Sequence, residues 1–181
     1  MKKIALVLLS VVAAFGIISC ASTATMDAAA QKQAQINQSF DKVYNAHASA
    51  LVLEGAKTYE VKSGDTLTKI TKEFYAGKDE NGYYFPLIML ASHNVVSDPE
   101  LITPGMKLTI PDFDANINDK AVAKKLSPYF KDLAGVYQQK DTPAAEDIRP
   151  HLIEISDLLG KETVSLEAEP AATEAAPAAS N

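Results

Sequence analysis

Two strand patterns enclose two helix patterns within about fifty residues, and few folds are compatible with this order. Apolar and polar side chains alternate at Tyr59–Val61 and again in the stretch MKLTIP at 106–111, as they do in strands. The apolar residues between them recur every three or four positions: Leu67, Ile70 and Phe74, then Tyr84, Leu87, Ile88 and Ala91. We therefore expect a strand–helix–helix–strand unit whose two strands pair antiparallel.

The turn from the first strand into the first helix reads Ser-Gly-Asp-Thr. Gly64 can adopt the positive φ that a sharp turn needs. Asp65 can cap the helix through its carboxylate, where the helix dipole also favours a negative charge. Thr66 then starts the helix and Leu67 faces the core. Folding alone can explain each of these residues.

The segment 59–111 resembles the lysin motif (LysM), a small βααβ module that binds glycans containing N-acetylglucosamine. The resemblance rests on YEVKSGDTL for the opening strand and turn, KITKEFY for the first helix, PLIMLAS for the second, and DPELITPGMKLTIP for the closing loop and strand. It covers 53 of the 181 residues. It implies an α+β fold with a two-stranded antiparallel sheet, here flanked by helices on both sides.

Two loops, 63–67 and 95–104, are expected to lie side by side at one end of the sheet. Their backbone amides and carbonyls would line a shallow groove, which suits an acetamido sugar because that group offers a donor, an acceptor and a methyl. The resemblance places glycan contacts at Gly64, Asp65, Thr66, Leu67, Leu101 and Ile102. For Asp65 two roles stay open: a helix cap only, or a cap that also contacts the sugar.

Residues 1–19 are expected to be an export signal, since two lysines precede a long apolar run with no acid. The run from Ile4 to Ser19 has 16 residues, which is short for a spanning helix of ~20. The only cysteine, Cys20, follows directly, and IISCAS resembles the lipobox of bacterial lipoproteins. This resemblance implies cleavage before Cys20 and attachment of acyl chains such as palmitate. The alternative is a plain secretory signal with an incidental thiol.

The chain that follows the signal is acidic. Loss of Lys2 and Lys3 leaves 15 basic residues against 23 acidic ones, a net charge of −8. We therefore expect no nucleic-acid partner, and an anionic wall polymer would have to be recognised by shape and hydrogen bonds. Ala21 is not the aspartate that retains some lipoproteins in the inner membrane, which favours the periplasmic side of an outer membrane where one exists.

The flanks on the N-terminal and C-terminal ends differ in composition. Residues 20–35 are small and polar and predict a lipid-anchored tether, whereas 36–55 has the apolar spacing of a helix that ends at Gly55. Residues 161–181 are rich in Ala, Glu, Pro and Ser, and we expect them to be disordered.

Residues 117–160 carry three short helical patterns. The first is Asp119–Leu126. Ser127 and Pro128 are typical of a new helix start, and so are Thr142 and Pro143. Pro150 is expected to kink or split the last helix.

The second helix of the module, YYFPLIMLASHN, is apolar almost all round, and such a helix is usually buried on two sides. We expect the helices of 36–54 and 119–159 to pack on its outer side and form one domain with the module. The alternative is that this face is a site for a protein partner.

We expect no enzyme, no metal and no cofactor. His47, His93 and His151 are far apart in sequence and have no metal-ligand spacing. The flanks are too short to build a cleft between two catalytic carboxylates. We interpret His47, on an apolar helix face, as a core residue.

The leading interpretation is a cell-envelope lipoprotein that binds peptidoglycan non-catalytically through one LysM unit and tethers the membrane to the wall. The alternative is an envelope scaffold or assembly lipoprotein that uses the LysM-like unit and its helices for protein–protein interaction.

Overall fold

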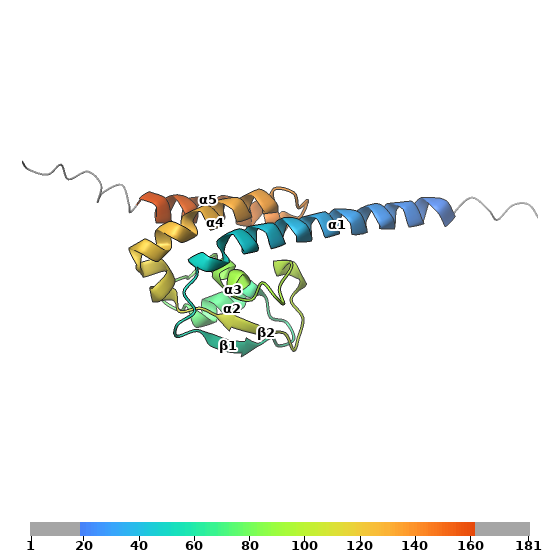
Figure 1. Ribbon diagram of the computed structural model, residues 1–181. Coiled ribbons are helices and arrows are strands. Elements are labelled where there is room, and N and C mark those ends of the chain that lie inside the picture. The colour runs from blue at the N-terminus through green and yellow to red at the C-terminus, as the bar shows by residue number, and fades with distance from the viewer. Residues whose placement is uncertain (1–18, 162–181) are drawn as a thin grey trace, which may run out of the picture. The chain divides into compact units, whose positions relative to one another are not determined.

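The computed structural model describes residues 19–161, and side chains from Asp27 onward (Figure 1). In chain order the elements are α1 (Ser19–His47), the 3₁₀ turn η1 (Ala48–Ala50), β1 (Lys57–Glu60), α2 (Leu67–Phe74), α3 (Phe85–Ala91), the 3₁₀ turn η2 (Pro99–Leu101), β2 (Lys107–Ile110), the π-helical turn η3 (Asp114–Asn118), α4 (Lys120–Tyr137) and α5 (Pro143–Lys161). Two compact units meet between Gln35 and Ile36, and the description below concerns the second.

Some predictions lie outside the described residues. These are the export signal before Ser19 and the disordered tail after Lys161. The backbone of Cys20 belongs to α1, but its side chain is not described. No helix in the described part of the chain combines the length and the apolar character that a membrane crossing requires.

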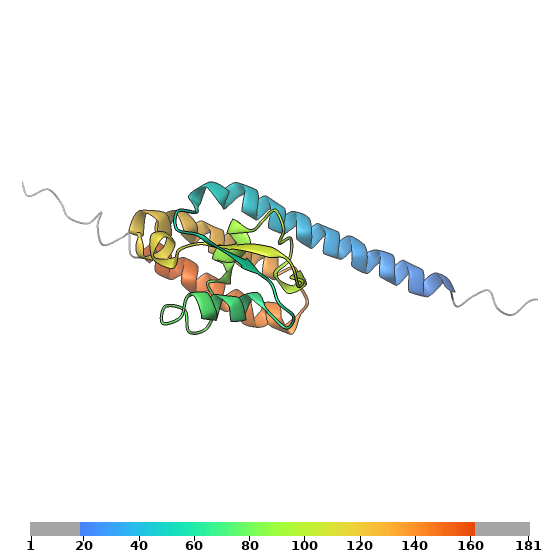
Figure 2. The same ribbon diagram turned by 90° about the horizontal axis from the view of Figure 1, so that it is seen from below.

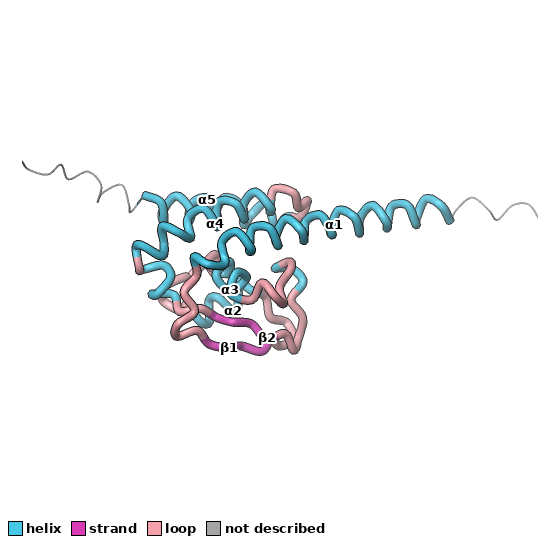
Figure 3. Tube along the Cα trace, in the orientation of Figure 1, coloured by secondary structure: helices cyan, strands magenta, loops and turns pink. Residues whose placement is uncertain are grey.

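The predicted sheet is confirmed. β1 and β2 pair antiparallel, with Lys57 opposite Ile110 and Glu60 opposite Lys107. Leu108 and Ile110 of β2 are buried on the side of the helices. α2 and α3 lie between this sheet and the pair α4–α5, and from the sheet side the two strands cross in front of α3 (Figures 2 and 3).

Helix α3 is buried all round, as its sequence predicts. Six consecutive residues, Phe85 to Leu90, are buried. The Tyr129 hydroxyl of α4 donates to the Pro86 carbonyl at 2.8 Å, and the Phe85 and Tyr137 rings lie 6.4 Å apart. These contacts confirm that the C-terminal helices pack on the outer side of the module and form one core with it.

Helices α4 and α5 are both continuous, so the predicted helix start at Ser127 is wrong and α5 is not split at Pro150. Pro128 lies inside α4 and Pro150 inside α5, although an interior proline costs about 3 kcal/mol. Each helix buries an apolar stripe along its length, which offsets that cost. Ser127 starts no helix; its hydroxyl donates to the Ser156 carbonyl at 2.9 Å, and the Ser156 hydroxyl donates back to the Ser127 carbonyl at 2.8 Å. Ser127, which is typical of a helix start, therefore lies inside α4 and connects it to α5.

Helix α1 also differs from expectation. It begins at Ser19 rather than Ile36 and ends at His47 rather than Gly55, so the predicted tether has a helical backbone. Alanine and glutamine dominate this stretch and favour helix. His47 is not fully buried: its Nε2 lies 2.8 Å from Asp132 Oδ2, and 13% of its side chain is exposed.

A buried ion pair joins the closing loop of the module to the end of α4. Lys140 Nζ lies 2.7 Å from both carboxylate oxygens of Asp98, and their side chains are only 4% and 2% exposed. Glu100 Oε1 is 3.2 Å from the same nitrogen. The rings of Phe40 and Tyr137 lie within 6.0 Å of it. Nothing in the sequence pattern indicated this pair, which connects residues 42 positions apart.

We predict that Lys140→Met will lower the free energy of unfolding by about 3–5 kcal/mol, because it removes the cation that lies against the buried Asp98 carboxylate. The double variant Lys140→Met/Asp98→Asn is expected to recover part of this loss, since it also removes the buried negative charge. The control is Lys78→Met, which breaks the exposed pair with Asp114 and should cost less than about 1 kcal/mol. Chemical denaturation measures all three; equal losses for Lys140→Met and Lys78→Met would contradict the prediction.

Candidate functional site

The turn after β1 is closed by the Asp65 carboxylate. Its Oδ2 accepts hydrogen bonds from the Lys62 amide at 2.8 Å and from the Tyr59 hydroxyl at 2.7 Å. Gly64 has a φ of +85°, which a side chain would disfavour. The carbonyl of Gly64 accepts from Lys69 Nζ at 2.9 Å. The turn is thus tied both to the strand before it and to the helix after it.

The residue that caps α2 is Thr66, so the predicted cap at Asp65 is wrong. Thr66 has extended backbone angles, and its side chain accepts from the Lys69 amide at 3.2 Å. α2 then begins at Leu67, one residue later than expected. Asp65 precedes the cap position, and its carboxylate turns back to two donors near the strand. One of these donors is Tyr59, six residues earlier in the sequence.

The charge state of this turn follows from its hydrogen bonds. The pKa of Asp65 is lowered, first by the hydrogen bond from the Lys62 amide, then by the one from Tyr59. The same contact with Asp65 is the main cause that raises the pKa of Tyr59 to about 12. At neutral pH the carboxylate is therefore ionised and the phenol keeps its proton.

The second loop is held in place at both of its ends. The buried carboxylate of Asp98 accepts from the Glu100 amide at 3.0 Å and so caps η2, and the same carboxylate also accepts from Lys140 Nζ. At the other end the Gly105 amide donates to the Val61 carbonyl at 2.9 Å. The loop between these anchors exposes Leu101, at 54%, and leaves Ile102 half-buried.

The two loops meet around a pocket of about 350 Å³, here called the loop pocket. Residues of the loops, of α2 and α3, and of the C-terminal helices line it: Asp65, Thr66, Leu67, Thr68, Phe85, Pro99, Glu100, Ile102, Tyr137, Ala144 and Ile148. Four of the six predicted contact residues are among them. Gly64 and Leu101 do not line the pocket.

The wall made by α5 is the part of this pocket that sequence reasoning missed. Ala144 and Ile148, one turn apart on α5, and Tyr137 at the end of α4 close what was expected to be a shallow groove between two loops. Ile148 recurs at helical spacing with Leu152, Ile155 and Leu159, a pattern that predicts a buried helix face but no pocket. Only the tertiary fold shows that the N-terminal end of this α5 face lies against the two loops.

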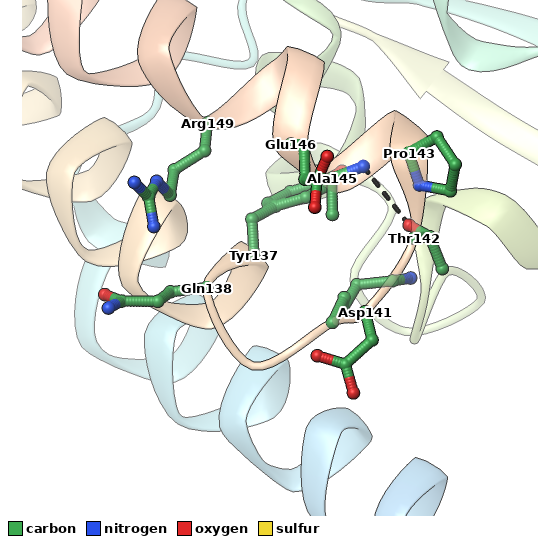
Figure 4. A pocket seen from close by; sticks show the side chains of 9 residues that line it. Tyr137, Gln138, Asp141, Thr142, Pro143, Ala145, Glu146 and Arg149 are labelled. Atoms are coloured by element: carbon green, nitrogen blue, oxygen red, sulfur yellow. Dashed lines mark hydrogen bonds between the residues drawn. The ribbon is translucent and has the colours of Figure 1, made fainter.

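A second pocket, of about 520 Å³, lies where α4 connects to α5 (Figure 4). We call it the α4–α5 pocket; its lining is mostly polar: Tyr137, Gln138, Lys140, Asp141, Thr142, Pro143, Ala145, Glu146 and Arg149. Thr142 caps α5 as predicted, because its Oγ1 accepts from the Ala145 amide at 3.2 Å. Arg149 is the only arginine in the sequence, and its side chain extends from α5 toward Gln138 (Figure 4).

The histidines lie in three different surroundings. His93 Nδ1 is 2.9 Å from the Leu90 carbonyl, and His151 stacks on Tyr83 with ring centroids 3.8 Å apart. Within residues 19–161 no group of His, Cys, Asp and Glu side chains is arranged to hold a metal ion. The loop pocket offers hydrogen bonding and apolar contact, and the α4–α5 pocket adds charged side chains.

We predict that Asp65→Asn will keep the turn and that Asp65→Ala will loosen it, because an amide oxygen can still accept from Lys62 and Tyr59. In the wild type a lowered pKa means that the carboxylate contacts are present at neutral pH and are lost as the pH falls through that pKa, below the ordinary 3.8. An NMR titration of the Asp65 side chain and the Lys62 amide measures both effects. A midpoint at or above 3.8 would contradict the assignment.

The comparisons with known proteins agree with this geometry. A sequence model of the LysM domain matches residues 59–111. An uncharacterised protein of Deinococcus radiodurans is 42% identical over 57 residues, which are 32% of this chain and 20% of that protein. The chain thus covers about a fifth of the length of this relative. No solved structure matches the chain significantly. Residues 59–111 of this protein form a LysM domain.

Proposed function

We propose that this protein binds the N-acetylglucosamine-containing glycan of peptidoglycan in the loop pocket, without catalysis. The observation that carries the proposal is the meeting of the two LysM loops around one pocket of about 350 Å³, lined by Asp65–Thr68 from the first loop and by Pro99, Glu100 and Ile102 from the second. This volume falls within the range of small-molecule sites, which start at about 300 Å³.

The lining suits an acetamido sugar. Leu67, Phe85 and Ile148 offer apolar contact for the acetyl methyl and the faces of the sugar ring, while Thr66 and Thr68 bring hydroxyls to the same pocket. Such a mixture of apolar walls and a few polar groups is usual for ligand pockets. No cationic side chain lines the loop pocket, so its chemistry favours a neutral sugar over an anion.

In this proposal the Asp65 carboxylate contacts the sugar and does not cap a helix. Oδ2 is occupied by Lys62 and Tyr59, whereas Oδ1 has no hydrogen-bond partner among the described residues. Because Asp65 also lines the loop pocket, we propose that Oδ1 accepts a hydrogen bond from a sugar hydroxyl or amide. The ionised carboxylate at neutral pH makes it a strong acceptor.

We further propose that the protein is an envelope lipoprotein, anchored through Cys20, that tethers a membrane to the wall. The lone cysteine directly after an export-signal pattern supports this proposal. Two or more acyl chains hold a protein stably at a membrane, whereas a single chain does so only marginally. The outer face of α3, the other candidate site for a protein partner, is covered by the C-terminal helices.

We predict that the chain without its signal and lipid will pellet with purified peptidoglycan, and that Ile148→Ala will weaken this binding about fivefold. The substitution removes part of an apolar contact, roughly 1 kcal/mol. The control Ile153→Ala removes the same atoms from an exposed site on the same helix and should leave binding unchanged. No pelleting of the wild type at low and moderate salt would overturn the proposed function, and thermal unfolding checks that both variants are folded.

A further inference from the structure

The loop pocket and the α4–α5 pocket lie on two sides of the same stretch of α5. Ala144 and Ile148 line the first, and Ala145 and Arg149, each one position later, line the second. Tyr137 lines both. Since successive helix residues are rotated by about 100°, one short stretch of helix supplies a wall to each pocket.

The edge between the two pockets is fixed by an ion pair and a hydrogen bond. Glu100 lines the loop pocket, and its Oε1 lies 3.2 Å from Lys140 Nζ and 3.3 Å from the Thr142 hydroxyl. Lys140 and Thr142 both line the α4–α5 pocket. A ligand that occupied both pockets would therefore cross a rigid edge at the start of α5.

The chemistry of the α4–α5 pocket differs from that of the loop pocket. Arg149 can bind a carboxylate through two parallel hydrogen bonds, and its guanidinium makes no hydrogen bond or ion pair within residues 19–161. Asp141 and Glu146 supply negative charge on the same lining, which disfavours a polyanion. A group that offers both amide or ammonium donors and a carboxylate matches this lining, and a short peptide is such a group.

The distance between the pockets suits a peptide that is attached to the bound sugar. A helix with its side chains is about 10–12 Å across, and an extended chain covers at most ~3.3–3.6 Å per residue. Three or four peptide residues are therefore long enough to pass from one side of α5 to the other. Because α5 begins at Pro143, the peptide would pass the end of the helix over the edge formed by Glu100, Lys140 and Thr142.

We propose that the α4–α5 pocket binds the peptide that branches from the glycan of peptidoglycan, with Arg149 on a peptide carboxylate. This inference rests on the proposed function, since the glycan in the loop pocket places the peptide. The protein then recognises glycan and peptide together, and helix α5, outside the LysM domain, contributes to both contacts. No covalent step is involved.

The test uses the chain without signal and lipid and two ligands: soluble peptidoglycan fragments with their peptides, and the same glycan after enzymatic removal of the peptides. Arg149→Ala is expected to weaken binding of the intact fragments about tenfold and to leave binding of the peptide-free glycan unchanged. Arg149→Lys keeps the charge but cannot make the bidentate hydrogen bonds of a guanidinium, so a smaller loss of affinity, about threefold, is expected. The control Lys124→Ala removes one exposed positive charge from α4 outside both pockets and should change neither affinity.

Titration calorimetry separates failure of this inference from failure of the proposed function. Equal affinity of the wild type and Arg149→Ala for intact fragments, with peptide-free glycan still bound, overturns the peptide site and leaves the loop pocket as the glycan site. An equal loss for both ligands also overturns it, because Arg149 would then act on the glycan or on the fold. Absence of wild-type binding to peptide-free glycan overturns the proposed function instead, and a selective effect of Arg149→Ala on intact fragments would still support the peptide contact.

Discussion

The buried contact between Lys140 and Asp98 connects the parts of this protein. Burial of two charges costs several kcal/mol per ion, which is offset only when both partners are held in good geometry. Here Asp98 belongs to the closing loop of the LysM domain, and Lys140 follows the last turn of α4, beneath the rings of Phe40 and Tyr137. The pair therefore requires that α1, the loop and the C-terminal helices be assembled together, and it fixes the loop that borders the loop pocket.

The binding surface that we propose is consequently a property of the whole folded unit. The LysM loops supply Asp65, Thr66 and Ile102, while α5 supplies Ala144 and Ile148. A groove between two loops would leave a bound sugar open to water on one side. With α5 in place, apolar side chains cover that side, and the removal of apolar area from water adds roughly 25 cal/mol per Å² to binding. The flank is thus part of the recognition surface that we propose.

The sequence predicts the parts of this structure that depend on local patterns. The order of strands and helices, the burial of α3 and the cap at Thr142 follow from periodicity and residue type. Prediction from the sequence is wrong or silent where a contact with a residue distant in the sequence determines the local structure. Asp65 turns to Tyr59 and leaves the cap to Thr66, and Pro128 stays inside a helix because α4 is packed along its length. The ion pair of Lys140 with Asp98 could not be predicted from local patterns, because the two residues are 42 positions apart in the sequence. Four of the six residues predicted to contact the glycan line the loop pocket, whereas the α5 wall of that pocket was not predicted.

The two faces of α5 have a consequence for how this chain can vary. Ala144 faces the loop pocket and Arg149 faces the α4–α5 pocket because their positions on the helix point in different directions. Which residue lines which pocket therefore depends on the helical register of α5. One residue inserted between Arg149 and Leu152 would turn the first two turns of α5 by about 100° relative to the packed remainder. Side chains of one pocket would then face the other. The start of this helix can therefore change by substitution much more readily than by a change in length.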